Sequence, residues 1–542
     1  MSIPKPEWRW PAIFAAILML LTCLPYVFGV FLRQPGWYYS GFILSPIDPN
    51  VYLAYMRQAR DGHLFLTDLF TTEPQPGRFI DLFWLTLGLS ARVTHLALPI
   101  VYHIARVISG WLLLMAVYWL SAQVIPTVWG RRLAVALTAT ASGVGWLFHT
   151  HGLQLHPIDY GPGLVMPEAI TFLTLLISPL FSFSTFLIIV IYGFAVHAFA
   201  TGSVRSTALA GLAALVLGNI HGYDIIPVAP IIALYVVVQV VTRRAALRAL
   251  RLLALIGAIA APSVLYQYWL QTIGDMTVVA KFMGPTASSP PMRWFALGLG
   301  LPLFLAAIAA VRGFAKGNDA TRLLVVWLVV GFAAVFAPVP FNRKLAEGLH
   351  IPVCVLAVLA FERLLRSAPR RMVFVGAGFI LLCLPSNALF LHRAMNDLIT
   401  NNQRYLGGLT PPVYLRPDQY DALRFLEGRV NRFDILLANP FLANYAPSLS
   451  GVRVYLGHWS ETLRYRGKIG QASIFLQAGT SDAERKAFFR KRRITYLLRD
   501  RSVYDDALIP LSLGAGGPFD PDHSPWLSKV YQRSHVAVYR VR

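Results

Sequence analysis

The sequence predicts an α-helical polytopic membrane protein with about eleven transmembrane helices, followed by a C-terminal soluble α/β domain. The first observation is the composition: of 542 residues, 56% are hydrophobic and only 14% are charged, and the mean hydropathy is +0.55. A soluble globular protein of this length carries more charge on its surface. The second observation is a series of apolar runs of spanning length. The third is a tail, from residue 393 onwards, in which the pattern changes.

The apolar runs are each roughly 17 to 25 residues long, enough to cross the hydrocarbon core of a bilayer as a helix. The first run has no small-residue cleavage site at its end, so we expect it to remain as the first transmembrane helix. The runs lie near residues 11–32, 99–121, 132–149, 180–200, 204–220, 224–241, 252–270, 294–312, 323–341, 350–367 and 372–391.

Alternate connections between these runs are short and basic, and the positive-inside rule assigns them to the cytoplasm together with the N-terminus. Their cations are Lys5, Arg9, Arg131, Arg132, Arg205, Arg243, Arg244, Arg248, Arg251, Arg312, Lys316, Arg322, Arg366, Arg370 and Arg371. The opposite connections, including the long first loop 33–98, are then extracytoplasmic, as is the tail. We therefore expect a multi-pass protein of the inner or plasma membrane, with a transmembrane domain at 1–392 and an extracytoplasmic domain at 393–542.

The chain is basic, with 48 Lys and Arg against 26 Asp and Glu and a formal net charge of +22. Most of this charge lies in short loops between apolar runs, an arrangement that favours anionic membrane lipids and phosphate-bearing ligands as partners. A nucleic acid partner is not expected, because the cations form no separate basic domain.

The tail alternates helix-like and strand-like segments, which is typical of a small α/β domain. At about 150 residues it is long enough to bury its own core. The expected helices are "DQYDALRFLEG" and "DAERKAFFRKRR", and the expected strands are "FDILLAN", "VRVYLGH", "ITYLLRD" and "HVAVYRV".

The first external loop opens with "SPIDPNVYLAYMRQARDG", residues 45–62. Asp48 precedes Pro49, and this pair favours a helix start in which the carboxylate caps the first turn and proline follows it. Apolar and aromatic residues, Tyr52 among them, then recur at helical spacing, while Arg57 lies away from them. The pattern predicts a short interfacial helix that ends at Gly62. A carboxylate anchored in this way also remains available to accept a substrate proton.

The segment "FNRKLAEGLHIP" places Arg343 and Lys344 at the outer end of a span, where the positive-inside rule disfavours cations. A lipid-linked phosphate is a natural partner, because Arg offers a two-pronged donor and Lys a point charge. The alternative is anchoring to headgroups, with Arg343 paired to Glu347 four residues later. Arg106, in the outer third of its own span, is a weaker phosphate candidate.

Two further external segments combine histidines with carboxylates, which invites a metal interpretation. "NIHGYD" contains His221 and Asp224, and the segment from residue 149 contains His149, His151, His156, Asp159 and Glu168. Their spacing follows no established ligand signature such as HExxH. We therefore expect no required metal, and Glu168 is a candidate to line the cavity.

In the tail, "GVRVYLGHWSET" predicts a strand followed by a helix start with Ser460 as its N-cap. His458, Trp459 and Glu461 are suited to a sugar acceptor, because they combine an aromatic surface with hydrogen-bonding groups. The alternative is a loop that docks the tail onto the membrane domain.

Together, these residues resemble the GT-C superfamily of integral-membrane glycosyltransferases. The resemblance rests on the long first external loop with an acid just beyond the first span, on "DPNVYLAYMRQARDG", and on the later "FNRKLAEGLHIP" and "GHWSET". These segments are similar to those of bacterial members described as family-39-like, ArnT-like or mannosyltransferase-like. The architecture covers the whole chain, whereas the motifs are short.

The resemblance implies an inverting transfer of a sugar from a polyprenyl-phosphate donor to a glycan, lipid or protein acceptor at the external face of the cell envelope. Asp48 is then the general base. Many relatives carry a second acid in this loop, for which Asp61, Asp68, Glu73 and Asp81 are candidates; Asp81 is the main rival, and Glu168 is a further acid on the same face. The remaining cavity candidates are Tyr52, Arg57, His221, Asp224, Glu347, His350, His458, Trp459 and Glu461.

No other cofactor is expected, since the sequence has neither a Walker A segment nor a Rossmann glycine pattern. A transporter or flippase of lipid-linked saccharides would use the same outer cations to hold phosphate. Transporters, however, usually carry ionisable residues near the bilayer midplane, and here the charges gather at one face. A third hypothesis is a non-catalytic scaffold whose tail binds a partner.

Overall fold

The computed structural model describes residues 3–148, 161–243, 246–273, 288–365, 369–401, 404–405, 408–502 and 519–542. The chain divides into two compact units. We call the first the membrane unit; it comprises Met1–Leu24, Tyr102–Trp269 and Thr286–Ala394. The second, the loop–tail unit, comprises Pro25–Val101, Leu270–Pro285 and Met395–Arg542. The tail therefore forms one compact unit with the first loop.

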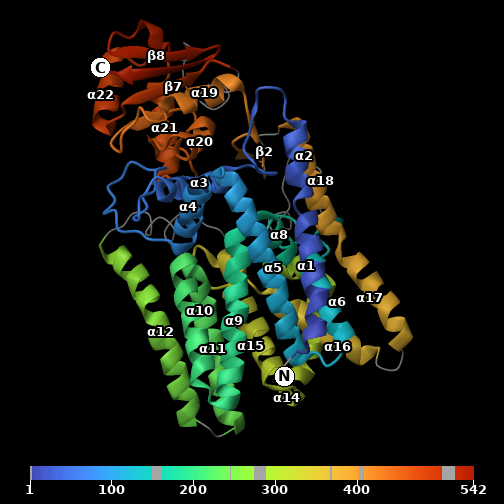
Figure 1. Ribbon diagram of the computed structural model, residues 1–542. Coiled ribbons are helices and arrows are strands. Elements are labelled where there is room, and N and C mark those ends of the chain that lie inside the picture. The colour runs from blue at the N-terminus through green and yellow to red at the C-terminus, as the bar shows by residue number, and fades with distance from the viewer. Residues whose placement is uncertain are drawn as a thin grey trace. The chain divides into compact units, whose positions relative to one another are not determined.

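The membrane unit is helical, and Figure 1 shows α9, α10 and α11 as neighbouring helices that run alongside one another. Its elements are η1 (Lys5–Trp8), α1 (Arg9–Leu21), most of α5 (Leu98–Val124), α6 (Val128–Thr140), α7 (Gly145–Phe148), α8 (Thr171–Ile177), α9 (Pro179–Thr201), α10 (Val204–Ile220), η3 (Gly222–Asp224), α11 (Ile225–Arg243), α12 (Ala246–Thr272), α14 (Met292–Lys316), α15 (Asp319–Ala334), η4 (Asn342–Ala346), α16 (His350–Leu364), α17 (Pro369–Cys383) and α18 (Pro385–Thr400).

Local signals explain where several of these helices begin. The Ser178 side chain accepts a hydrogen bond from the backbone N–H of Phe181, with Pro179 in the first turn of α9. Ser203 caps α10 and Asn318 caps α15 in the same way. These caps satisfy backbone donors that a helix start leaves without partners, and they are visible in the sequence.

Among the described residues, seven helices are long and apolar enough to cross a membrane, or eight if the bent pair Met372–Cys383 and Pro385–Thr400 forms one span. The chain is thus a multi-pass membrane protein, but the predicted count of about eleven is not confirmed. The difference arises at the short helices α6, α10 and α15, of 13, 17 and 16 residues. A perpendicular crossing needs about 20 residues. In the candidate span Asn342–Leu364, an 18-residue apolar window is fully buried within the protein, whereas Leu364 at its end is exposed.

The tail contributes a five-stranded sheet of order β6-β5-β7-β9-β8 (Figure 1). Strands β6, β5 and β7 are parallel, whereas β9 is antiparallel to both of its neighbours. The predicted tail segments form as expected, with β5 in "FDILLAN", β6 in "VRVYLGH", β7 in "ITYLLRD" and β9 in "HVAVYRV". The strands are β5 (Ile435–Leu437), β6 (Arg453–Val454), β7 (Tyr496–Asp500), β8 (Leu527–Arg533) and β9 (Val536–Val541).

Helices cover this sheet, and buried Leu437, Phe489 and Leu497 lie in the core between them. The helix α22 begins with a capping box in which Ser481 and Glu484 exchange hydrogen bonds, and α19 matches the predicted "DQYDALRFLEG". The tail helices are α19 (Pro417–Leu426), α20 (Pro440–Ser450), α21 (Tyr465–Phe475), α22 (Asp482–Arg492) and η6 (Pro521–His523).

The first loop pairs directly with the tail inside the loop–tail unit. Strand β1 (Tyr38–Tyr39) is antiparallel to β4 (Tyr414–Leu415), and a further short pair joins β2 (Arg404–Tyr405) to β3 (Gly408–Leu409). The helix α3 (Ile47–Arg60) packs against α4 (Leu82–Thr94) and α20, and α2 (Leu24–Leu32) precedes the loop. The loop is therefore part of the same fold as the tail.

The helix predicted after Asp48 is present as α3, but it is not an exposed surface helix. Most of its residues are buried, including Arg57, which is only 7% exposed although the pattern placed it on the polar face. Arg57 donates to the carbonyl oxygen of Leu449 at 2.9 Å and to Glu427 at 2.8 Å. A charge can be buried here because these partners satisfy it. Sequence spacing alone does not reveal such partners.

Candidate functional site

Asp48 is the acid of the first loop that combines exposure with a buried imidazole partner. It lies in the first turn of α3, and its side chain is 57% exposed. Its Oδ1 lies 2.9 Å from Nε2 of His458, whose side chain is 1% exposed. Both residues belong to the loop–tail unit.

The other four acids of loop 33–98 have local partners. Asp61 lies 3.5 Å from Arg57 and 3.0 Å from Arg60. Asp68 is fully buried and accepts a hydrogen bond from the backbone N–H of Phe70 at 2.7 Å. Glu73 binds Lys468 at 2.8 Å. Burial alone would raise the pKa of Glu73, but hydrogen bonds from Lys468 and Thr71 outweigh it and hold that pKa below its ordinary value.

The fourth of these acids, Asp81, is a helix cap. Its Oδ1 accepts hydrogen bonds from the backbone N–H groups of Phe83 at 3.0 Å and Trp84 at 3.2 Å, at the start of α4. The prediction that Asp48 caps its own helix is wrong, because α3 starts two residues earlier than expected, at Ile47, after an N-cap at Pro46. The capping carboxylate of this loop is Asp81, and Asp48 instead lies within the first helical turn.

The hydrogen bonds of His458 define its tautomer. Nδ1 lies 3.2 Å from the backbone nitrogen of Ser460 and 3.1 Å from that of Glu461, and both of these groups can only donate. Nδ1 is therefore the acceptor, and the ring proton of the neutral imidazole resides on Nε2. Nε2–H then donates to the Asp48 carboxylate. The imidazole is thus fixed at one edge by backbone and orients Asp48 with the other.

Asn444 of α20 links the two backbone segments that carry this pair. Its amide nitrogen donates to the carbonyl of Ile47 at 3.2 Å and to the carbonyl of Gly457 at 3.1 Å. Its oxygen accepts from Asn50 at 2.8 Å, and the side chain is fully buried. Ile47 and Gly457 directly precede Asp48 and His458. Asn444 therefore sets the register of the two segments, and no motif in the sequence indicated it.

The segment after His458 forms a turn rather than a helix start. The Thr462 hydroxyl accepts from the backbone N–H groups of Gly457 at 3.1 Å and His458 at 3.2 Å, and it donates to the carbonyl of Phe70 at 2.6 Å. The prediction of Ser460 as an N-cap is wrong, because α21 begins only at Tyr465.

Trp459 and Glu461 flank the pair. The Trp459 ring is 41% exposed and stacks with its centroid 6.1 Å from that of His458. The buried Oε2 atom of Glu461 has no hydrogen-bond partner among the described residues. An exposed indole and an unsatisfied carboxylate oxygen are groups that a sugar can contact. Tyr52, the other aromatic candidate, stacks on Trp84 with ring centroids 4.5 Å apart.

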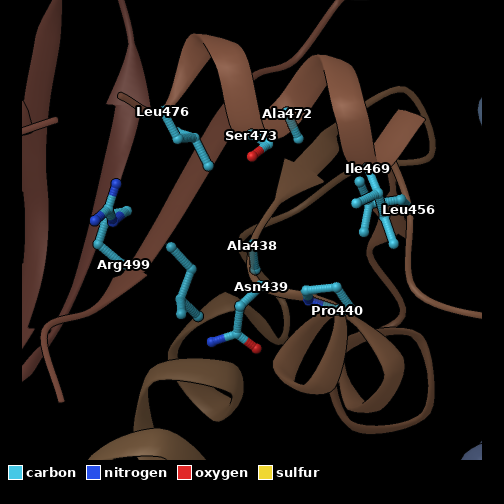
Figure 2. A pocket seen from close by; sticks show the side chains of 10 residues that line it. Ala438, Asn439, Pro440, Leu456, Ile469, Ala472, Ser473, Leu476 and Arg499 are labelled. Carbon is cyan, nitrogen blue, oxygen red and sulfur yellow. The ribbon is translucent and has the colours of Figure 1, made fainter. Parts of the chain in front are cut away.

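A separate pocket lies at the carboxyl end of the parallel strands of the tail. Figure 2 shows Asn439 and Arg499 at this pocket among mostly apolar side chains such as Leu476 and Ile469. None of the predicted site residues lines it.

In the membrane unit, Arg343 and Lys344 lie on η4, at the start of the apolar segment Asn342–Leu364. Arg343 donates to the carbonyl of Val165 at 3.1 Å and lies 3.5 Å from Glu168. The Arg343–Glu347 pair, which belonged to the alternative of headgroup anchoring, does not occur among the described contacts; Arg343 lies beside Glu168 instead. The buried Nε of Arg343 has no acceptor within the described chain, and Lys344 lies 4.4 Å above the ring centroid of Tyr223.

Three predicted residues come together beside these cations. His221, Asp224 and Glu347 each offer a ligand atom, and these atoms lie within 4.8 Å of one another. Glu168 is also close enough to Glu347 to interact with it electrostatically. The sequence indicated the pair in "NIHGYD" but gave no sign that Glu347, far along the chain, would join it.

Two further candidates, Arg106 and His350, are buried inside the membrane unit. The Arg106 guanidinium is fully buried and contacts the Thr22 hydroxyl at 2.7 Å and the carbonyl of Leu175 at 3.0 Å. Nδ1 of His350, which is also buried, accepts from the backbone N–H of Thr171 at 3.3 Å. His149, His151, His156 and Asp159 lie outside the described residues.

No protein-family model matches the chain, and no curated protein sequence is significantly similar to it. Solved structures are similar in fold. The oligosaccharyltransferase of Archaeoglobus fulgidus, in complex with zinc and sulfate, aligns with a TM-score of 0.54 at 14% identity, over 90% of this chain and 68% of that one. The archaeal oligosaccharyltransferase AglB from Archaeoglobus fulgidus, in complex with an inhibitory peptide and a dolichol-phosphate, aligns with a TM-score of 0.53 at 11% identity, over 91% of this chain and 70% of that one.

ArnT from Cupriavidus metallidurans, bound to undecaprenyl phosphate, aligns with a TM-score of 0.52 at 12% identity, over 97% of both chains. The neighbours are glycosyltransferases of the GT-C type. At these identities the similarity establishes the fold of the chain, and the resemblance seen in its sequence is confirmed at that level.

Proposed function

From the GT-C fold of the chain, we propose that this protein is a membrane glycosyltransferase that moves a sugar from a polyprenyl-phosphate donor to an acceptor at the extracytoplasmic face. The observation that carries the proposal is the Asp48–His458 pair: an exposed carboxylate oriented by a buried, neutral imidazole. General bases require this combination of access and fixed geometry.

In this reaction Asp48 accepts the proton of an acceptor hydroxyl or amine. The acceptor atom forms a bond to the anomeric carbon while the bond from that carbon to the phosphate oxygen breaks, so the polyprenyl phosphate leaves and the configuration inverts. His458 stays neutral throughout, because its Nδ1 serves two backbone N–H groups. Its role is to keep the Asp48 carboxylate in one orientation.

The donor phosphate is assigned to Arg343 and Lys344. Two neighbouring cations at the end of a buried apolar segment suit a phosphate attached to a lipid, and a buried guanidinium Nε without an acceptor adds a donor. AglB and ArnT have been solved with dolichol-phosphate and undecaprenyl phosphate, which supports a donor of this class. The alternation of basic loops predicts that Asp48 and the two cations, Arg343 and Lys344, lie on the same side of the membrane.

The test is a transfer assay with purified protein in detergent, using a set of polyprenyl-phosphate sugars and following the release of the polyprenyl phosphate. Asp48→Asn should bind donor yet lose at least ~100-fold in kcat, the low end of what general-base catalysis contributes. The matched control is Asp81→Asn, because asparagine caps a helix almost as well as aspartate, and this variant should stay within a few-fold of the parent. An Asp48→Asn variant as active as Asp81→Asn contradicts the assignment.

The orientation is tested separately with protease added to sealed vesicles whose cytoplasmic side faces inwards. We expect cleavage in the tail beyond residue 393, since the basic connections place it outside. Protection of the tail until the vesicles are opened by detergent would reverse the topology, and with it the side on which the reaction takes place.

A further inference from the structure

The carboxylate–imidazole cluster in the membrane unit joins two segments that are distant in sequence. His221 follows the last residue of α10, Asp224 ends η3, and Glu347 follows η4. The helices η3 and η4 pack against each other, which brings their polar ends together. The three ligand atoms lie within 4.8 Å of one another, close enough to bind a single ion.

The cluster is buried, and two of its oxygens lack partners. Asp224 is fully buried and Glu347 is 3% exposed. Asp224 Oδ2 lies 2.8 Å from Nδ1 of His221, and Glu347 Oε1 accepts from the Thr185 hydroxyl at 3.1 Å. Asp224 Oδ1 and Glu347 Oε2 have no hydrogen-bond partner among the described residues. Two buried carboxylates with unsatisfied oxygens are unfavourable unless a positive charge reaches them.

The nearby cations have other contacts. Arg343 lies 3.5 Å from Glu168, and Lys344 lies over the Tyr223 ring with its Nζ 3.4 Å from the phenol oxygen. The positive charge that neutralises Asp224 Oδ1 and Glu347 Oε2 therefore has to come from a proton on the cluster or from a bound ion. A bound ion is favoured over a proton, because ligand atoms of three different residues lie within 4.8 Å of one another.

We propose that His221, Asp224 and Glu347 bind one divalent transition-metal ion, Zn²⁺ or Mn²⁺. One imidazole nitrogen with two carboxylate oxygens suits these ions, whereas Mg²⁺ and Ca²⁺ prefer sites made of oxygen alone. Three protein ligands leave at least one coordination position open, as in sites that also hold water or a substrate oxygen. Sequence spacing alone led us to expect no metal, because Glu347 is too distant in the sequence to complete a motif.

The test measures metal binding by the full-length protein in detergent, with no donor present, so its result does not depend on the proposed reaction. Protein stripped with chelator is titrated with Zn²⁺ or Mn²⁺, passed through a desalting column and assayed for metal by mass spectrometry. We expect one ion per chain, a higher unfolding temperature with the ion, and no comparable effect of Mg²⁺ at the same concentration.

The variants His221→Ala, Asp224→Asn and Glu347→Gln should each weaken affinity by at least about 10-fold. The Asn and Gln changes preserve shape, so they report on ligation rather than on folding. Two controls should retain the parent affinity: His197→Ala, an exposed histidine on α9, and Glu362→Gln, a buried carboxylate on α16 that contacts Thr127.

Absence of a stoichiometric ion would overturn the proposal and would mean that a proton neutralises the cluster. Equal affinity in the ligand variants and the parent would overturn it as well, since the ion would then lie elsewhere. Loss of binding in both control variants would have the same consequence, because the effect would not be specific to the cluster.

Discussion

Replacing His458 by asparagine or by glutamine tests the roles of its two ring nitrogens separately. The asparagine amide is short and reaches only the position of Nδ1, so His458→Asn keeps an acceptor for the backbone N–H groups of Ser460 and Glu461 but loses the donor to Asp48. Glutamine is longer and reaches the position of Nε2, so His458→Gln keeps the donor and loses the acceptor. The side chain is 1% exposed, and water therefore cannot replace either function fully.

The expected magnitudes follow from these contacts. His458→Asn should lower kcat by roughly 10- to 100-fold with little change in acceptor KM, since loss of an orienting hydrogen bond misplaces the base. His458→Gln leaves two backbone donors without an acceptor, at about 1–3 kcal/mol for each one that becomes buried and unsatisfied. For a unit of this size each kcal/mol lowers the unfolding temperature by roughly 2–4 °C. The His458→Gln variant should therefore lose stability, whereas the His458→Asn variant should lose activity.

The assays are steady-state transfer and thermal unfolding on the same preparations. Because His458 acts through Asp48, the double variant Asp48→Asn/His458→Asn should be no slower than Asp48→Asn alone. Additive losses in the double variant would refute the positioning role and assign His458 an independent one. A His458→Asn variant within about 3-fold of the parent kcat would show that the hydrogen bond to Asp48 has no catalytic consequence.

Two other predictions concern residues that hold the site together. Asn444→Ala should lower the unfolding temperature and kcat together, because it leaves the carbonyl of Gly457 and the side-chain amide of Asn50 without their Asn444 partners, at about 1–3 kcal/mol for each unsatisfied group; thermal unfolding and transfer assays measure both. Replacing Arg343 and Lys344 by glutamine should raise the donor KM more than it lowers kcat, since a phosphate clamp acts in the ground state as well as in the transition state.

Each of these predictions has a matched control in the chain. Asn396 is an exposed asparagine on α18, and its replacement by alanine should leave stability nearly unchanged. Arg363 is an exposed cation at the opposite end of the segment that begins with Arg343, and Arg363→Gln should leave the donor KM unchanged. If Asn444→Ala were as stable as Asn396→Ala, Asn444 would not set the register. An unchanged donor KM in the Arg343/Lys344 variant would remove the phosphate assignment.

The sequence predicted those elements that local signals determine. The strands around Leu436, Leu497 and Val538 were found because buried strands form short apolar runs, and α22 was found in the helix-like segment "DAERKAFFRKRR". The predicted number of spans is not confirmed, because apolar composition does not distinguish a crossing helix from a shorter buried one such as α6.

The chemistry of the site was only partly predictable, because its contacts span long distances in sequence. Asp48 and Asp81 both precede helix-forming segments, but α3 starts two residues earlier than expected, so of the two only Asp81 is an N-cap. His458 was identified as a site candidate, but its bond to Asp48 joins residues 410 positions apart. Asn444 carries no motif, and its importance appears only when its three partners are brought together in space.

The long separation between Asp48 and His458 also orders events during biosynthesis. A ribosome adding about 5–20 residues per second takes roughly 20–80 s to pass from one to the other. Strand β9, which lies between β7 and β8, follows both of them in the chain, so the sheet cannot close before β9 has been synthesised. A nascent chain whose first loop has already been inserted therefore has no partner for Asp48. A chain interrupted before residue 458 therefore lacks the imidazole that orients the Asp48 carboxylate.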